Sequence, residues 1–420
     1  MTTTLRQLAA LLLSTAILFT GNGLINTLLP VRAEIEAFST LEIGLLGTVY
    51  FAGFILGCLN VPLVVRRVGH IRTFAALSSV IAATALAHVF FIDPIAWGVL
   101  RFLVGFAFAG LYVAIESWLN DRAASASRGA IMSAYTFICL CVLMAGQFLL
   151  TAYDPAGFEP FALVAILIAI ALVPVSLTKA PEPPRPVTIG LDIAGLWRLS
   201  PVGFVGCLSV GLVNGSFWSL GPVFASRSGL DIDGLVYFIA GATLAGALLQ
   251  WPLGLVSDRI DRRFVIVGAT LCAAASGVLL STWAEPSHLL LIGLSAAFGG
   301  FAMPLYAVSV AHANDHATDT RFVATAGGLL LVYGIGASLG PLIASALMGH
   351  YGSGGLFMFT SSVHMALALF TIVRMALRPR RAAEDRTGFV AVPRTSPTLY
   401  ELDPRSEAES EAESDGDTAR

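Results

Sequence analysis

The sequence predicts an all-α membrane protein, with twelve transmembrane helices arranged as two homologous six-helix bundles. The chain is 56% hydrophobic and only 12% charged, and its mean hydropathy is +0.80, whereas soluble globular chains carry about 25% charged residues. Its apolar residues fall in runs of roughly twenty, the length of a helix that crosses the hydrocarbon core of a bilayer. The third observation is an internal repeat.

Short motifs recur in the two halves of the chain at a nearly constant spacing, which indicates a duplication. Two residues of the first half have no counterpart, because Arg101 and Glu116 fall opposite Ser295 and Val310. The repeated pairs, each 194 residues apart, are Gly105 and Gly299, Leu111 and Leu305, Tyr112 and Tyr306, Asn120 and Asn314, Asp121 and Asp315, and Gly146 and Gly340. Shared residues are expected to build the scaffold, and the two unmatched residues to carry function.

The apolar runs give each half six spans. The first bundle, residues 1–178, has spans at about 8–30, 42–64, 73–91, 95–118, 129–151 and 159–178. The second bundle, residues 201–378, has spans at about 201–223, 232–254, 264–283, 288–310, 322–348 and 355–376.

The two segments outside the bundles are polar. Residues 179–200 are rich in proline and predict a partly extended cytoplasmic linker. Residues 379–420 include an acidic run at 401–417 and predict a disordered acidic cytoplasmic tail. We expect this tail to be a solvated terminus rather than a regulatory element.

The distribution of basic residues predicts the orientation. The loops on the side of the N-terminus carry 17 basic residues, and the other loops carry two, Arg32 and Arg227. Basic residues concentrate on the cytoplasmic side, so both termini are expected in the cytoplasm, with the protein multi-pass in a bacterial inner (plasma) membrane. Arg6 before the first apolar run also fits a signal peptide, but that run has a partner in the second half, so we expect it to be retained.

Composition argues against several classes of function. There is no basic patch for nucleic acid. The five cysteines lie in apolar runs without a CxxC motif, and no histidines have metal-like spacing, so no metal site is expected. The only lysine, Lys179, does not follow a glycine-rich phosphate loop. We therefore expect no cofactor and no nucleotide-driven step, and nothing in the sequence points to an enzyme.

A charged loop follows the eighth span. Its charges of both signs can latch and release helix ends. The candidate gating residues are Gly254, where the helix ends, and the charged Asp258, Arg259, Arg262 and Arg263. The pattern resembles the signature loop of the major facilitator superfamily, G-x3-D-R-x-G-R-[RK], with Asp261 where that family usually has Gly. The first-half copy at 66–70 has no Asp. The resemblance implies a gating loop; the alternative is a loop that only sets topology.

Arg101 lies inside the fourth span. A guanidinium there costs roughly 2.5–3.5 kcal/mol on insertion scales, so it is expected to face a cavity or partner. The segment from Arg101 to Ala109 resembles the superfamily's fourth-helix motif, R-x3-G-x-[GA]-x-A. The alternative is that Arg101 reaches the headgroups from the outer end of its span.

Glu116 is a carboxylate placed inside the apolar fourth span. Burial favours the protonated form of a carboxyl, so Glu116 is a candidate proton carrier. It lies about 22 Å from Arg101 along the helix, at 1.5 Å per residue, and the two cannot pair. Alternatively, Glu116 is solvated at the cytoplasmic face or pairs with Arg122.

Polar and aromatic residues on the first, fourth, seventh and tenth spans predict a substrate cavity. They are Asn22, Asn26, Tyr112, Asn214, Trp218 and Tyr306. The alternative for each is an interhelical hydrogen bond or packing contact. No metal or cofactor joins them in this prediction.

The eleventh span contains Gly336, Gly340 and Pro341, which permit close helix approach and a bend. This resembles the superfamily's G-x3-G-P motif, which antiporters carry on the fifth helix. Here the fifth span has Ala145-Gly146-Gln147 and no Pro. The antiporter signature is therefore absent from its usual place.

Taken together, residues 1–378 resemble the major facilitator superfamily, and more narrowly its YcaD-like branch of unknown function. The narrower resemblance rests on residues 26–31, 101–117, 250–254 and 338–341. It implies the major facilitator fold, with helices 1, 4, 7 and 10 lining a central cavity and alternating access by rocking of the bundles.

We expect a secondary active transporter of a small organic solute, proton-coupled, with Glu116 carrying the proton and Arg101 binding an anionic group or biasing that titration. Its expected partners are a small-molecule substrate, protons and the lipid bilayer, and it is expected to be a monomer. The alternatives are a drug-like efflux pump of the same fold, a channel-like facilitator, or a non-transporting membrane sensor or scaffold that signals through its tail.

Overall fold

The computed structural model describes residues 2–122, 128–177, 192–282, 287–317, 322–377, 388–390 and 394–402. Its first half contains α1 (Thr2–Ile35), α2 (Thr40–Val68), α3 (His70–Phe90), α4 (Pro94–Arg122), α5 (Arg128–Phe148), the 3-10 helix η2 (Leu149–Ala152) and α6 (Glu159–Ser176). The second half contains α7 (Ile193–Leu199), α8 (Pro201–Arg227), α9 (Ile232–Arg259), α10 (Arg262–Thr282), α11 (His288–Ala302), α12 (Leu305–Asn314), α13 (Phe322–Tyr351) and α14 (Gly355–Leu377). The 3-10 helix η5 (Pro397–Leu402) follows.

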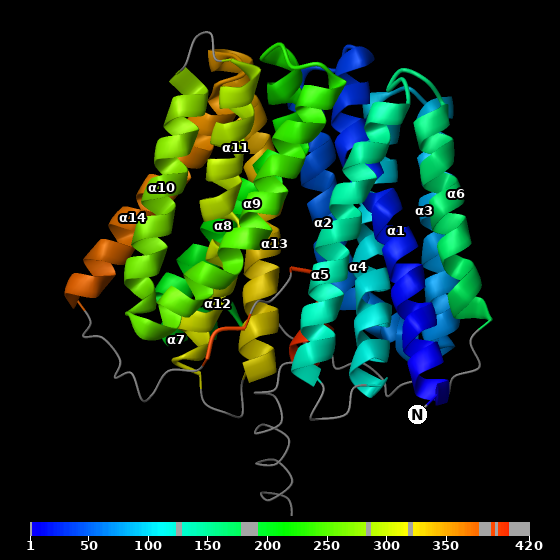
Figure 1. The fold of residues 1–420 in the computed structure, drawn as a ribbon, viewed down its shortest axis with the longest axis horizontal. Coiled ribbons are helices and arrows are strands. Elements are labelled where there is room, and N and C mark those ends of the chain that lie inside the picture. Colours follow the sequence, from blue (N-terminus) through cyan, green and yellow to red (C-terminus); the bar gives the residue numbers. More distant parts are fainter. Residues whose placement is uncertain are drawn as a thin grey trace, which may run out of the picture.

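Among the described residues, twelve helical segments are long and apolar enough to cross a membrane. The prediction of twelve spans in an all-α membrane protein is confirmed. Figure 1 shows α1–α6 as one bundle beside a second bundle of α8–α14. We call the end of the molecule that carries the α9–α10 turn the latch end; the N-terminus lies there too (Figure 1).

The repeated glycines mark equivalent close approaches in the two bundles. A Cβ at Gly105 would meet the Tyr50 carbonyl, so α4 lies directly against α2; Gly299 has the same relation to Ala242 and holds α11 against α9. Gly146 and Gly340 likewise allow α5 to touch α1 and α13 to touch α8. The duplication therefore preserves backbone contacts that need the absence of a side chain.

The tenth span is interrupted. The sequence predicts one helix over 288–310, but α11 ends at Ala302 and α12 begins at Leu305. Pro304 has no amide hydrogen to donate to the preceding turn, and it stands at the break as the N-cap of α12. The break places Met303 and Tyr306 against the central cavity.

The two bundles are joined tightly at the end opposite the latch. Arg227 of α8 forms an ion pair with Glu34 of α1 at 2.7 Å. The hydroxyl of Ser338 on α13 donates to the Thr48 carbonyl of α2 at 3.0 Å. A Cβ at Gly44 of α2 would collide with a side chain of α13. This end of the molecule is closed.

Part of the C-terminal tail differs from the sequence expectation. Residues 379–420 were expected to be a disordered acidic tail, but η5 lies between the bundles, and Leu399 and Tyr400 are fully buried. The physical reason is local composition, because the segment from Pro397 to Tyr400 is free of charge and precedes the acidic run. The 401–417 run lies almost wholly outside the described residues, as does most of the predicted 179–200 linker.

Candidate functional site: a cavity between the bundles

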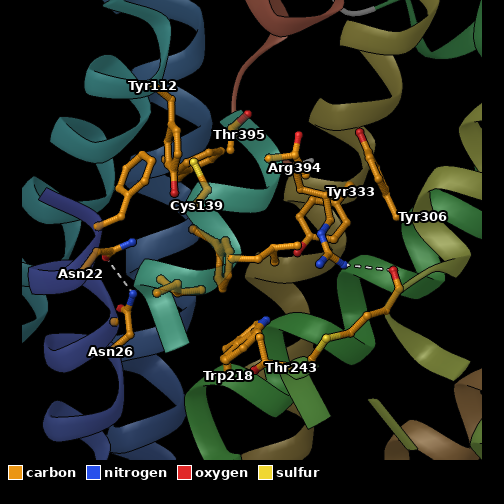
Figure 2. A pocket seen from close by; sticks show the side chains of 18 of the residues that line it. Asn22, Asn26, Tyr112, Cys139, Trp218, Thr243, Tyr306, Tyr333, Arg394 and Thr395 are labelled. Atoms are coloured by element: carbon orange, nitrogen blue, oxygen red, sulfur yellow. Dashed lines mark hydrogen bonds between the residues drawn. The ribbon is translucent and has the colours of Figure 1, made fainter. Parts of the chain in front are cut away.

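A cavity of about 210 Å³ lies between the two bundles. Six predicted residues line it: Asn22, Asn26, Arg101, Tyr112, Trp218 and Tyr306. Figure 2 shows Asn22, Asn26 and Tyr112 on the side of the first bundle, and Trp218, Tyr306 and Tyr333 on the side of the second. Two predicted residues, Asn214 and Glu116, are not among its lining residues.

Arg101 is the buried cation of this cavity, with 8% of its surface exposed. Its guanidinium carbon lies 4.2 Å from the centre of the Tyr50 ring, a cation–π contact. Both terminal nitrogens reach Asn26 Oδ1 only at a long 3.4 Å. Its Nε has no hydrogen-bond partner, and no ion pair among the described residues includes Arg101. The arginine therefore enters the cavity without a neutralising carboxylate.

The two asparagines of α1 are held by each other. Asn26 Nδ2 donates to Asn22 Oδ1 at 2.8 Å, one helical turn apart (Figure 2). This bond aims the Asn26 oxygen at Arg101, so Asn22 positions the group that contacts the cation. Both asparagines line the cavity, and the hydrogen bond between them lies within α1 rather than between helices.

Aromatic rings line both sides of the cavity. The Tyr112 ring lies 4.9 Å from Phe19 and 6.2 Å from Phe54, centre to centre. On the other side, the Tyr306 ring lies 5.2 Å from Tyr333. Tyr112 and Tyr306 are a repeated pair, so the duplication supplies one ring to each wall. Trp218 of α8, beside Ser219, lines the cavity at the end opposite the latch end.

Asn214 lies one turn before Trp218 on α8 but is fully packed. It is 2% exposed, and its Nδ2 has no hydrogen-bond partner within the described part of the chain. Asn214 is thus buried among packed helices and is not part of the cavity wall.

Glu116 is completely buried on α4, apart from the main cavity. Tyr135 of α5 donates to its Oε1 at 2.9 Å. The hydroxyl of Ser396, from the C-terminal segment, bonds to its Oε2. None of the ion pairs between described residues includes Glu116, and the side chain of Arg122 lies outside the described set. Glu116 is therefore held by hydroxyl groups, which can also donate to a carboxylate after it loses its proton.

The predicted gating loop forms an ion network around Arg262. This side chain is 1% exposed, and its Nε lies 2.8 Å from Asp315 Oδ2. A second nitrogen lies 3.3 Å from Asp258, and a third donates to Ser257 at 3.1 Å. Arg262 thus ties the end of α9 to the end of α12 within the second bundle.

Asp261 stands where the family usually has glycine, and it engages Arg263 at 2.6 Å. Burial raises the pKa of Asp261, but the hydrogen bonds and charge of Arg263 outweigh burial and hold that pKa below its usual range. Arg259 is exposed, and Gly254 is buried under the Phe389 ring of the tail.

The glycines of the eleventh span act through close packing. A Cβ at Gly336 would meet the Leu208 carbonyl of α8, and one at Gly340 would meet that of Leu212. Pro341 follows inside α13 without ending the helix. The two glycines fix the contact of α8 with α13, whereas Pro341 lies against Gly44 and Gly47 of α2. None of the three is a lining residue of the cavity.

The cavity lining includes residues that the sequence analysis did not indicate, among them Tyr50, Tyr333 and Arg394. Tyr50 and Tyr333 are single phenols inside apolar spans, and such an amphipathic ring is a usable signal because buried phenols need a polar surrounding. Arg394 carried no signal, since it lies in a polar tail beyond the last span. Its guanidinium lies 5.7 Å from the Tyr333 ring and 6.0 Å from the Tyr306 ring (Figure 2).

No group of three or more His, Cys, Asp or Glu side chains that could hold a metal occurs among the described residues. What the arrangement offers is recognition: a cation, two amides and several ring faces around a small space. A separate buried carboxyl with hydroxyl partners can hold or release a proton.

The family model of the Major Facilitator Superfamily matches residues 11–249 and 234–402. Sequence relatives include the "Uncharacterized MFS-type transporter YcaD" of Escherichia fergusonii, 28% identical over 383 residues, 90% of this chain and 98% of that protein. The protein of the same name in Salmonella arizonae is 25% identical over 385 residues, 91% of this chain and 100% of that protein.

Solved structures of similar fold include the nucleoside transporter NupG, with a TM-score of 0.78 at 12% identity over 87% of this chain and 98% of NupG. A bacterial homologue of the human lysosomal transporter Spinster, in an inward-facing and occupied conformation, gives a TM-score of 0.71 at 16% identity over 90% of this chain and 97% of that one. At these identities the likeness concerns the fold alone. With its sequence match over nearly the whole chain and its twelve spans around a central cavity, this chain belongs to the major facilitator superfamily of membrane transporters and is a relative of YcaD.

Proposed function

We propose that the chain is a proton-coupled secondary transporter of a small organic anion. The observation that carries this proposal is the buried Arg101, which faces the cavity with no carboxylate partner among the described residues. An unpaired guanidinium in a membrane protein costs roughly 2.5–3.5 kcal/mol on insertion scales. An anionic group of the solute offsets this cost when it binds, by charge-assisted hydrogen bonds.

The size of the cavity supports a small solute. Its volume of about 210 Å³ is below the range of about 300–1,000 Å³ that is typical of drug-sized ligands. The ring faces of Tyr50, Tyr112 and Tyr333 suit a solute with a flat or apolar part. The aromatic lining also favours a drug-like efflux pump as the second candidate, while the volume and the missing fifth-helix motif favour the first.

Glu116 is the proposed proton carrier. It is fully buried, and Tyr135 and Ser396 offer it hydrogen bonds in either protonation state. Because it lies apart from the cavity lining, it would couple through the rocking of α4 rather than by touching the solute. Alternating access would then open the bundles at either end in turn.

The proposed orientation places the latch end in the cytoplasm of a bacterial cell, with the protein in the inner membrane and both termini inside. The basic residues of the loops support it. The ion pair of Arg227 with Glu34 then lies on the outer face, so the described state would be closed to the outside.

The test is a thermal-shift screen of the purified full chain against small carboxylates, phosphates, sugars and amines. Stabilisation by anions, lost in Arg101→Gln, supports the proposal. Stabilisation by neutral or cationic solutes alone would contradict it.

A non-transporting sensor is distinguished in cells. Deleting residues 382–420 would remove a sensor's phenotype while Arg101→Ala would leave it intact. If the protein is a transporter, Arg101→Ala should instead remove the phenotype.

A further inference from the structure

The C-terminal segment has a place that its sequence did not indicate. We call residues 388–390 and 394–402 the C-terminal plug. Its helix η5 packs against α4 and α5 of the first bundle and against α13 of the second. In Figure 1 the segment runs between the two bundles at the latch end.

The burial of the plug is that of a core element. Leu399 and Tyr400 are 0% exposed, and Ser396 is equally buried. Leu399 and Tyr400 belong to the same hydrophobic cluster as the helices of both bundles. A segment that contacts both bundles at once holds them in one relative position.

The plug contacts two of the candidate functional residues at this end. Ser396 bonds to the Glu116 carboxylate, and the Tyr400 hydroxyl lies 2.5 Å from that of Tyr306. These bonds join the plug to the proposed proton carrier and to the cavity wall.

Two further contacts extend this set. The amide of Phe389 donates to Asp258 at 2.9 Å, and its ring covers Gly254. Arg394 enters the cavity, and its Nη1 points at the Met303 carbonyl at 3.5 Å, where the tenth span is interrupted (Figure 2). The plug therefore contacts the gating loop, and its Arg394 is a second cation in the cavity that Arg101 lines.

We propose that the C-terminal plug is a removable intramolecular stopper: docked, it closes the latch end of the cavity, shields Glu116 from water and locks the bundles together. Undocked, it opens a path from that end to Glu116 and takes Arg394 out of the cavity. The occupant of this interface is thus a segment of the chain itself. This inference goes beyond transport and does not depend on the identity of the solute.

The first test is hydrogen exchange of the purified full chain in lipid nanodiscs, read by mass spectrometry. Leu399→Asp places an unpaired carboxylate in a buried apolar position and should displace the plug. The matched control is Leu289→Asp, at the start of α11, where the leucine is 80% exposed and an acid is favourable at a helix N-terminus.

We expect peptides that cover 394–402 to be protected in the wild type and in Leu289→Asp. In Leu399→Asp they should exchange at least about tenfold faster, while the twelve spans keep their protection. Rapid exchange in the wild type would show that the plug is not docked. Equal protection of these peptides in Leu399→Asp and the wild type would show that the plug is an integral part of the fold and not removable. Either result overturns the proposal.

The second test measures access to Glu116 directly. The probe is a water-soluble carbodiimide with glycine methyl ester, and modification of Glu116 is quantified after proteolysis. Glu116 should react slowly in the wild type and in Leu289→Asp, and at least about tenfold faster in Leu399→Asp, because water and reagent then reach it. Equal reactivity in wild type and Leu399→Asp contradicts the shielding role. Neither readout involves transport, so failure of the transport proposal would leave both results interpretable.

Discussion

At the residue scale, the proposed binding of an anion rests on Arg101, whose charge has no carboxylate partner among the described residues. Its position was recognisable in the sequence because a guanidinium in a membrane helix needs a reason to be there. Asn26 and Tyr50 contact it, but neither neutralises it. The remaining capacity of the guanidinium is available to a ligand.

Arg101→Gln should weaken binding of any anion found by the thermal-shift screen by at least about tenfold, roughly 1.4 kcal/mol, because a charge-assisted hydrogen bond is lost. Titration calorimetry on the purified protein measures the change. The control is Arg198→Gln on α7, which removes the same charge at an exposed position outside the cavity. Unchanged affinity in Arg101→Gln would exclude Arg101 as the anion site.

The sequence was informative where a residue broke the local rule. Arg101 and Glu116 stand out in apolar spans and are unmatched in the second half, and the structure buries both. Tyr50 and Tyr333 gave a weaker signal than a charged residue does, because tyrosine is common near membranes. Asn214 is predicted to line the cavity but is buried between helices. Helical spacing indicates which residues share a face of α8, but it does not indicate which neighbouring helix covers that face.

At the element scale, the repeat is a set of close helix contacts. Glycines at equivalent positions let α4 approach α2 in the first half and α11 approach α9 in the second. Such contacts replace the hydrophobic effect, which does not drive helices together in lipid. The spans themselves are predictable from the length of the apolar runs. The break at Pro304 is not, because an apolar run continues through a position where the backbone loses a hydrogen bond.

Gly336→Ala should lower the free energy of unfolding by about 1–3 kcal/mol, because its Cβ meets the Leu208 carbonyl and overpacks the contact of α13 with α8. Apparent melting temperature in detergent measures this. Gly349→Ala, on the same helix, meets no atom within 4 Å and should not destabilise the protein. Equal melting temperatures for the two variants would refute the packing role.

The gating loop provides a second test at this scale. Arg262→Ala removes the guanidinium that lies 2.8 Å from Asp315, whose side chain is 5% exposed, and should lower the free energy of unfolding by about 3–5 kcal/mol. The double variant Arg262→Met with Asp315→Leu should regain part of that loss, because both charges of this buried pair are then replaced by apolar side chains. A single variant as stable as the wild type would mean that Arg262 does not hold α9 to α12.

At the scale of the whole molecule, the two bundles share a scaffold and differ in chemistry. The shared glycines and tyrosines build equivalent contacts and cavity walls, while Arg101 and Glu116 occur once. The position of η5 between the bundles was not predictable, because the composition of a segment does not identify the surface that receives it. In the proposed arrangement the docked plug controls access at the latch end, while the ion pair of Arg227 with Glu34 closes the other end.

In the proposed mechanism, the buried carboxyl of Glu116 couples protons to the movement of a solute through this cavity. It is tested most directly in proteoliposomes that contain wild type or Glu116→Gln, with an imposed pH gradient and a mixture of small organic anions. The vesicle contents are then analysed by mass spectrometry. We expect the wild type to concentrate at least one anion only while the gradient lasts, and Glu116→Gln to exchange that anion without concentrating it. Equal gradient-driven accumulation in Glu116→Gln and wild type would contradict the account.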